Sequence, residues 1–353
     1  MSLDSIEGMM KHGLADSLFT SALLLVAKDD EILFHEPYGT LGGTGTGETT
    51  HDSLFDLASL TKILATTPLW MLLERDRPEM IDKNLGDLLH ECPDHKAAIT
   101  PRHLLAHASG LPAWRPYYLL SSGDVDRAEF TLGRILSEKL EYAPGEGFKY
   151  SDLGFMLLAF LLELDSGNRL EVLSKERVFE PIGLAQDLKF LPDARDEVIA
   201  LTRVDDPAGI VNDLNARRLG GVAGHAGLFG TARGVSRLAQ EILLSLKTDR
   251  GFFDQSVAKV FCSPTGFPFG KGRGLGFQTA EAAEASCGDL FSRKSLGHTG
   301  FTGTSLWIDP EIDLITVLLT NRVFMGESDF RIKDFRPAVH TAVIEAAAGM
   351  AKS

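Results

Sequence analysis

An uncharged run over residues 63–73 constrains the fold most, because so long an apolar segment has to be buried. Ser59 and Lys62 stand directly before it, three residues apart. On a helix, this spacing places both side chains on one face, one turn apart. Burial lowers the pKa of a lysine toward the range in which its amine can act as a base. If a helix begins near Ser59, its first free N–H groups also lie beside the hydroxyl. The segment therefore predicts a nucleophilic serine with an adjacent base.

A second pair with the same spacing, Ser256 and Lys259, shows that the pattern alone is not specific. About one chance match is expected in a chain of this length. Ser256 lies in an amphipathic stretch, so we expect Lys259 to face solvent. For Ser59 and Lys62 the structural alternative is a helix cap followed by a lysine whose stem packs on apolar surface. Context favours this first pair as the catalytic one.

The charge balance limits the possible partners. Lys and Arg number 35 against 49 Asp and Glu, a net charge of −14, which disfavours nucleic acid and anionic membrane surfaces. No stretch has the length of a membrane span. Cys92, Cys262 and Cys287 are odd in number and widely spaced, which predicts buried thiols. We expect a small-molecule substrate, with no metal or cofactor.

The N-terminal region shows no export signal. The apolar residues 22–27 are too short for the core of a signal peptide and follow acidic rather than basic residues. The sequence as given predicts a cytoplasmic protein. A periplasmic or secreted location is the alternative if a leader has been removed ahead of Met1.

Predicted strands lie at both ends of the chain and predicted helices lie between them. The strands are expected over residues 20–27, 31–35, 305–308 and 314–319. The helices are expected over residues 4–17, from Ser59 onward, and over 84–90, 100–109, 127–141, 153–164, 231–246 and 335–350. Pro68 predicts a kink inside the helix that follows Ser59. The alternating glycines of residues 270–276 predict a strand with one bare face rather than a phosphate loop.

His103 and His107 lie four residues apart, the spacing of two zinc ligands on a helix. No glutamate base lies between them and no third ligand is evident in the sequence. Packing or helix capping is therefore the favoured interpretation of both histidines.

Three short motifs occur in a fixed order along the chain. They are Ser59 with Lys62, then Tyr150-Ser151-Asp152, then His298-Thr299-Gly300. This order resembles the S-x-x-K, Y-x-N and K/H-T-G signature of the serine penicillin-recognising enzymes, in particular the branch of class C β-lactamases, D-alanyl-D-alanine carboxypeptidases and esterases. Flanking stretches such as GGVAGHAGLFGTA and GHTGFTGTSLWIDP are similar as well, and the similarity runs from about residue 15 to 345.

The resemblance implies an α+β fold of the β-lactamase/transpeptidase type. Its five-stranded antiparallel sheet, with helices on both faces, would comprise residues 1–58 and 272–353. A mostly helical region would comprise residues 59–271, with the active site between the two. The strands predicted at both ends of the chain agree with this layout.

The resemblance also implies a role for each motif residue. Ser59 would form an acyl-enzyme, while Lys62 and Tyr150 share the acid and base work. The backbone N–H groups of Ser59 and Phe301 would form the oxyanion hole. The implied substrate-binding residues are Asp152, His298, Thr299 and Gly300.

Two departures from the signature bear on the reaction. Asp152 replaces the usual asparagine and would favour a charged Lys62, and His298 replaces the commoner lysine. Both make β-lactam hydrolysis less favoured, so we predict an esterase or amidase that acts on a small acyl substrate. A β-lactamase or D-alanyl-D-alanine carboxypeptidase is the alternative. A catalytically idle relative that binds peptide-like ligands is the alternative from another class.

Overall fold

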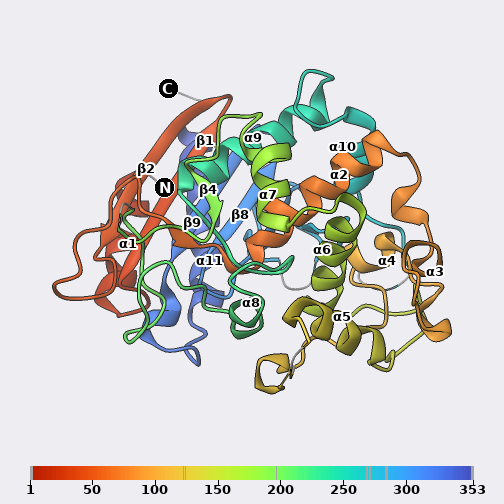
Figure 1. Cartoon of the computed structure of the whole chain (residues 1–353). Helices are drawn as coiled ribbons and strands as arrows, with labels where there is room; N and C mark the ends of the chain where they lie inside the picture. The colour runs from red at the N-terminus through yellow and green to blue at the C-terminus, as the bar shows by residue number, and fades with distance from the viewer. Residues whose placement is uncertain are drawn as a thin grey trace.

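The computed structural model describes residues 3–350 except 122, 124, 196, 268, 270, 271, 283 and 284. Its main element is a six-stranded sheet in the order β2-β1-β9-β8-β7-β6, in which each neighbouring pair is antiparallel. Its strands are β1 (Ser21–Lys28), β2 (Glu31–Gly39), β6 (Gln278–Thr279), β7 (Leu296–Thr299), β8 (Ser305–Asp309) and β9 (Leu314–Thr320). Figure 1 shows the two ends of the chain, red and blue, side by side in this sheet. The predicted antiparallel sheet is confirmed, with the two-residue β6 as an additional edge strand.

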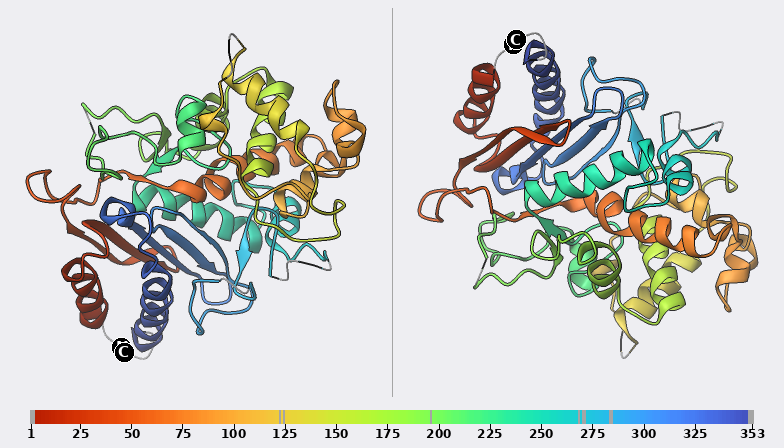
Figure 2. Two further views of the ribbon diagram at one scale, coloured as in Figure 1. Left: turned by 90° about the horizontal axis from the view of Figure 1, so that it is seen from below. Right: turned by 90° about the horizontal axis from the view of Figure 1, so that it is seen from above.

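Both faces of the sheet are covered by helices, as predicted. Helices α1 (Leu3–Ala15) and α11 (Ile332–Met350) lie together on one face and α9 (Ala232–Lys247) lies on the other, as Figure 2 shows. Strand β1 runs between them, so successive side chains enter different cores. Leu24 packs with α1 and α11, whereas Leu25 packs with the core that includes α9. This explains why residues 21–27 are buried at every position.

A mostly helical region lies between the strand-forming ends of the chain. Its α-helices are α2 (Thr67–Asp76), α3 (Leu85–Leu88), α4 (Pro101–Leu105), α5 (Arg127–Ser137), α6 (Asp152–Ser166), α7 (Leu170–Ser174), α8 (Leu214–Arg218) and α10 (Gln255–Cys262). A small sheet joins β3 (Phe55–Asp56), β5 (Leu228–Gly230) and β4 (Leu188–Phe190). Across the residues that the structure describes, no helix is long and apolar enough to cross a membrane.

Helix α6 is the centre of this region. Residues 153–162 are buried without interruption, so the helix is apolar around its whole circumference and has to be surrounded by protein. Ser151 caps it by accepting a hydrogen bond from the Gly154 N–H at 3.2 Å. The cap fixes where the helix begins, and Tyr150 immediately precedes it.

The helix after Ser59 differs from the prediction. Ala58–Leu60 is a 3₁₀ turn, Lys62–Thr66 is a π-helix, and α2 begins only at Thr67. Pro68 therefore lies in the first turn of α2, directly after the π-helical turn, where its missing N–H is tolerated. A π-helical turn is also a place where helices bend, so the predicted kink at Pro68 stays a prediction.

The strand predicted over residues 270–276 is wrong. Gly272 and Gly276 have φ angles of +78° and +91°, which belong to turns, and only Arg273 bridges to Gln278 in strand fashion. Gly270 and Lys271 lie outside the described residues. Alternating glycines here mark close backbone turns rather than the bare face of a sheet.

Candidate active site

The turn that carries Ser59 is held by Asp56, a residue that the sequence did not single out. Ala58 has a φ of +45°, a strained conformation for a residue with a Cβ atom. The two carboxylate oxygens of Asp56 accept hydrogen bonds from the Ala58 N–H at 2.8 Å and the Asn212 N–H at 2.7 Å. Burial raises the pKa of Asp56 to about 6, against the opposing effect of these two donors. Asp56 thus fixes the backbone immediately before Ser59.

Lys62 lies under Ser59 and is fully buried. Its amine is 2.9 Å from Ser59 Oγ, 2.8 Å from Asp152 Oδ1 and 3.3 Å from the His225 carbonyl oxygen. Burial alone would lower the pKa of Lys62, but Asp152 and Tyr150 outweigh it and the pKa lies above its ordinary value. The lowered pKa expected from burial is therefore wrong, whereas the effect expected of Asp152 is present. Lys62 is an ammonium at neutral pH.

Tyr150 also lies close to the Lys62 amine. The centre of its ring is 4.9 Å from Lys62 Nζ, 4.5 Å from the centre of the His107 ring and 5.8 Å from that of His298. Burial raises the pKa of the Tyr150 phenol, partly offset by the charge of Lys62, so the phenol is protonated at neutral pH. Side chains from residues 59–62, 150–152 and 298 thus meet in one place.

The end of β7 packs against the Ser59 turn. The Nδ1 atom of His298 lies 2.7 Å from the Thr299 carbonyl oxygen and donates to it, which leaves Nε2 as an acceptor. Burial lowers the pKa of His298 well below its usual value, so the ring is neutral. A Cβ atom on Gly300 would lie 2.7 Å from the Leu57 carbonyl oxygen. Only glycine allows this approach of the strand to the serine.

The predicted site residues line one cavity of about 660 Å³. The exception is Lys62, which is fully buried and lies beneath the cavity floor. The predicted residues that line it are Ser59, Tyr150, Asp152, His298, Thr299, Gly300 and Phe301. Within the described part of the chain, neither the Ser59 N–H nor the Phe301 N–H donates a hydrogen bond. Both remain available to a ligand in the cavity.

The glycine-rich residues 220–230 contribute the buried His225, which sequence reasoning missed and which pairs with the partly exposed Asp213. A Cβ atom on Gly224 would lie 2.1 Å from the Phe155 carbonyl oxygen, so the glycine lets the segment approach α6. This places the His225 carbonyl on the Lys62 amine, while His225 Nε2 lies 3.0 Å from Asp213 Oδ1. Burial opposes ionisation of Asp213, but His225 outweighs it and lowers its pKa to about 2. The five glycines among eleven residues were the available signal.

The other candidates from the sequence lie elsewhere. Ser256 is exposed and donates to the Asp254 carboxylate that caps α10, and Lys259 is exposed, as predicted. His103 completes a capping box with Thr100, which confirms the capping interpretation. His107 is buried and its Nδ1 accepts from the Ser151 N–H at 3.0 Å. Residues with described positions form no cluster of three or more His, Cys, Asp or Glu side chains suited to a metal ion.

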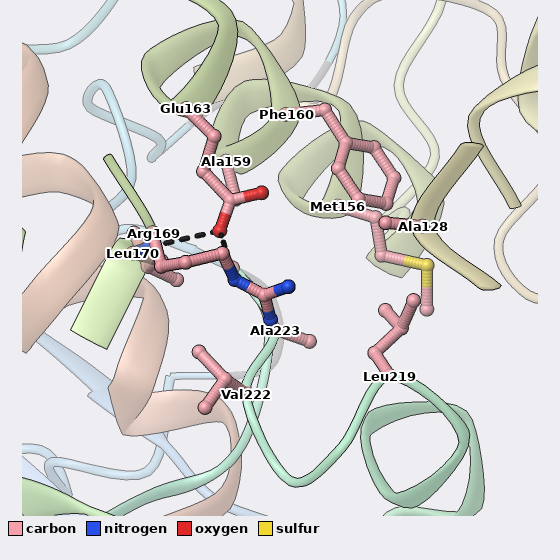
Figure 3. A pocket seen from close by; sticks show the side chains of 11 residues that line it. Ala128, Met156, Ala159, Phe160, Glu163, Arg169, Leu170, Leu219, Val222 and Ala223 are labelled. Carbon is pink, nitrogen blue, oxygen red and sulfur yellow. Dashed lines mark hydrogen bonds and ion pairs between the residues drawn. The ribbon is translucent and has the colours of Figure 1, made fainter. Parts of the chain in front are cut away.

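A second cavity, between α6 and residues 219–224, is too small to be a substrate site. Figure 3 shows Glu163 and Arg169 at its edge, and its volume is about 10 Å³, no more than one water molecule needs. Glu163 accepts from the Leu170 N–H at 2.8 Å and lies 3.4 Å from Arg169. This carboxylate therefore binds the first backbone N–H group of α7.

The fold and the site together are those of a serine hydrolase. The chain belongs to the beta-lactamase family, because the model of that family matches residues 6–339. Among curated proteins it is 29% identical to an N-acetylmuramyl-L-alanine amidase of Bacillus subtilis (strain 168), with 91% of this chain and 81% of the relative covered.

Solved structures share the fold at lower identity. EstCE1, described as a hydrolase with promiscuous acyltransferase activity, superimposes with a TM-score of 0.75 at 21% identity, over 96% of this chain and 98% of that one. A beta-lactamase/D-alanine carboxypeptidase from Pseudomonas syringae gives a TM-score of 0.73 at 16% identity, over 96% and 99%. The α+β fold predicted from the sequence is thereby confirmed.

Proposed function

We propose that the protein is a serine hydrolase that forms an acyl-enzyme on Ser59 and acts as an esterase or amidase on a small acyl substrate. The observation that carries the proposal is the Lys62 amine, which lies 2.9 Å from Ser59 Oγ at the floor of a cavity of about 660 Å³. A buried amine in contact with an accessible hydroxyl is one arrangement by which a serine nucleophile is activated.

Lys62 and Tyr150 act as a coupled pair in the proposed reaction. At neutral pH both groups hold their protons, because both pKa values lie above the ordinary ones. When the pair loses one proton it becomes the base that takes the proton of the Ser59 hydroxyl as Oγ attacks the substrate carbonyl. The same proton passes to the leaving group as its bond to the carbonyl breaks, and water then hydrolyses the ester on Ser59.

The oxyanion formed by this attack would be bound by the Ser59 and Phe301 N–H groups. Both residues line the cavity, and neither N–H is engaged by another described residue. In comparable sites one such donor contributes about 3 kcal/mol to the transition state.

The choice of an ester or amide over a β-lactam is supported by the charge at His298. A lysine at this place would offer a fixed positive charge to a substrate carboxylate, whereas His298 is neutral and presents an acceptor. The relative named as an amidase and the structure described as a hydrolase and acyltransferase agree with this preference. Hydrolysis of β-lactams or of D-alanyl-D-alanine peptides remains the second candidate, supported by a relative of Escherichia coli (strain K12), 28% identical over 86% of this chain, that is named a putative D-alanyl-D-alanine carboxypeptidase.

Covalent labelling tests the proposal directly. After incubation with a fluorophosphonate, mass spectrometry should find one adduct, on Ser59, which Ser59→Ala abolishes. Ser256→Ala is the matched control, since it removes the serine of the second S-x-x-K pair, and it should label as the wild type does. An unlabelled wild type would instead favour the catalytically idle relative. Rates on a p-nitrophenyl ester and on a chromogenic cephalosporin then separate the two substrate classes.

A further inference from the structure

The turn that carries the proposed oxyanion donor Phe301 is held by a buried arginine that lines the same cavity. Arg336 enters from α11 and donates to the carbonyl oxygens of Gly300 at 2.6 Å, Thr304 at 2.9 Å and Gly303 at 3.1 Å. Three hydrogen bonds from one guanidinium thus end on one five-residue turn, residues 300–304. The planar guanidinium fixes the relative orientation of the three carbonyls.

One of these bonds reaches the oxyanion donor itself. The Gly300 carbonyl and the Phe301 N–H belong to the same peptide group, which is planar. The bond from Arg336 to Gly300 O therefore fixes the direction in which the Phe301 N–H points. A positive donor on the carbonyl also polarises the peptide and strengthens its N–H as a donor, since hydrogen bonds in a chain reinforce one another.

The burial of Arg336 is costly for a residue that serves stability alone. Only 6% of it is exposed, and its hydrogen bonds within the described part of the chain go to carbonyls rather than to a carboxylate. A buried charge without an opposite charge is normally avoided. Arg336 also lines the cavity that contains Ser59 and Phe301, so its charge lies near the place where negative charge would develop in the reaction.

A second arginine reinforces the same turn. Arg322, 2% exposed, donates through Nε to the Phe301 carbonyl at 2.9 Å, and its guanidinium lies 4.6 Å from the centre of the Phe301 ring. Its other donors bind the carbonyls of Glu327 and Asp329. The peptide groups on both sides of Phe301 are thus each held by an arginine.

We propose that Arg336 is a positioning residue of the oxyanion hole, which orients and polarises the Phe301 N–H through the Gly300 carbonyl. Its positive charge lies at the wall of the same cavity as the neutral His298. This inference rests on the proposed function, because it requires that an oxyanion forms at Ser59.

Arg336→Met tests the inference by separating kcat from KM on a p-nitrophenyl ester. A misdirected oxyanion donor should lower kcat by about 10²-fold with KM unchanged, since the donor acts in the transition state. The affinity for a boronic acid that adds to Ser59 should fall by a similar factor. Arg336→Lys keeps the charge but not the fork of donors, and should give an intermediate kcat.

His340→Ala is the matched control, because His340 lies one turn further along α11 and is fully buried. Its side chain bonds Ser305 Oγ at 3.0 Å and, within the described part of the chain, forms no hydrogen bond with residues 300–304. It should lower the melting temperature and leave kcat unchanged. The inference is overturned if Arg336→Met only lowers the melting temperature, or raises KM alone. If Arg336→Met does not fold, Arg336→Lys is judged by the same criteria. Labelling of wild-type Ser59 is read independently, and its absence would refute the proposed function itself.

Discussion

The Lys62 amine lies 2.8 Å from Asp152 Oδ1, and the Lys62 side chain has no contact with solvent. A buried amine alone would lose its proton easily, but the carboxylate beside it stabilises the ammonium. The pair formed by Lys62 and Tyr150 therefore gives up a proton only at raised pH. The identity of residue 152 thus sets the pH at which the proposed base becomes available.

Asp152→Asn should move the rising limb of the pH–rate profile to lower pH. Without the carboxylate the pKa of Lys62 falls, and opposite charges at this distance shift a pKa by about one to three units. The measurement is kcat/KM on a p-nitrophenyl ester from pH 5 to 10. Asp193→Asn, which removes an exposed carboxylate paired with Arg195, is the control and should leave the profile in place. An unmoved profile in Asp152→Asn would reject the coupling.

The fold could be predicted from the sequence where elements have a periodic pattern. Strands β1, β8 and β9 and helices α1, α6 and α9 lie close to their predicted positions, because each carries a long run with a buried face. Strand β6 has two residues and no run to detect. The π-helix before Pro68 depends on the packing of residues 62–66 inside the core, which no local pattern specifies.

The candidate site was predictable only in part, for a similar reason. Ser59 and Lys62 are neighbours in sequence, so their contact follows from helical spacing. Tyr150, Asp152 and His298 were selected by resemblance to a family signature and not by spacing. Asp56 binds the Ser59 turn locally, through the Ala58 N–H, but its second donor, Asn212, is 156 positions away. His225 and Arg336 contact Lys62 and Gly300 across 163 and 36 positions, and no local motif marks such distant contacts.

Asp56→Asn should lower both the stability of the fold and kcat. Two backbone N–H groups donate to the two carboxylate oxygens, whereas an amide offers one oxygen and turns a second donor toward an N–H. An unsatisfied buried donor costs about 1–3 kcal/mol, and release of the strained Ala58 displaces Ser59. Urea denaturation and ester kinetics would measure the two effects. Full kcat in a destabilised variant would show that Asp56 does not position the nucleophile.

His340→Ala should make the protein less sensitive to acid. Burial lowers the pKa of His340 to about 3, against an ordinary 6.5, with a further contribution from Arg336. Between these values the unfolded chain binds a proton that the folded chain does not, so His340 reduces stability as the pH falls, by about 1.4 kcal/mol per pH unit. Without His340, the unfolding free energy should fall less steeply between pH 6 and 4, by about 1.4 kcal/mol for each pH unit.

Gly300→Ala should separate β7 from the Ser59 turn. The added Cβ atom would lie 2.1 Å from Thr304 Oγ1 and 2.7 Å from the Leu57 carbonyl oxygen, and the backbone oxygen cannot move without moving Ser59. We expect a loss of about 1–3 kcal/mol in unfolding free energy and of most of the kcat. Gly133→Ala in α5 is the matched control, since nothing lies within 4 Å of its Cβ position. There the same methyl group should stabilise the helix by up to about 1 kcal/mol and leave kcat unchanged. Equal behaviour of the two variants in urea denaturation and ester kinetics would contradict the close approach of Gly300 to the serine turn.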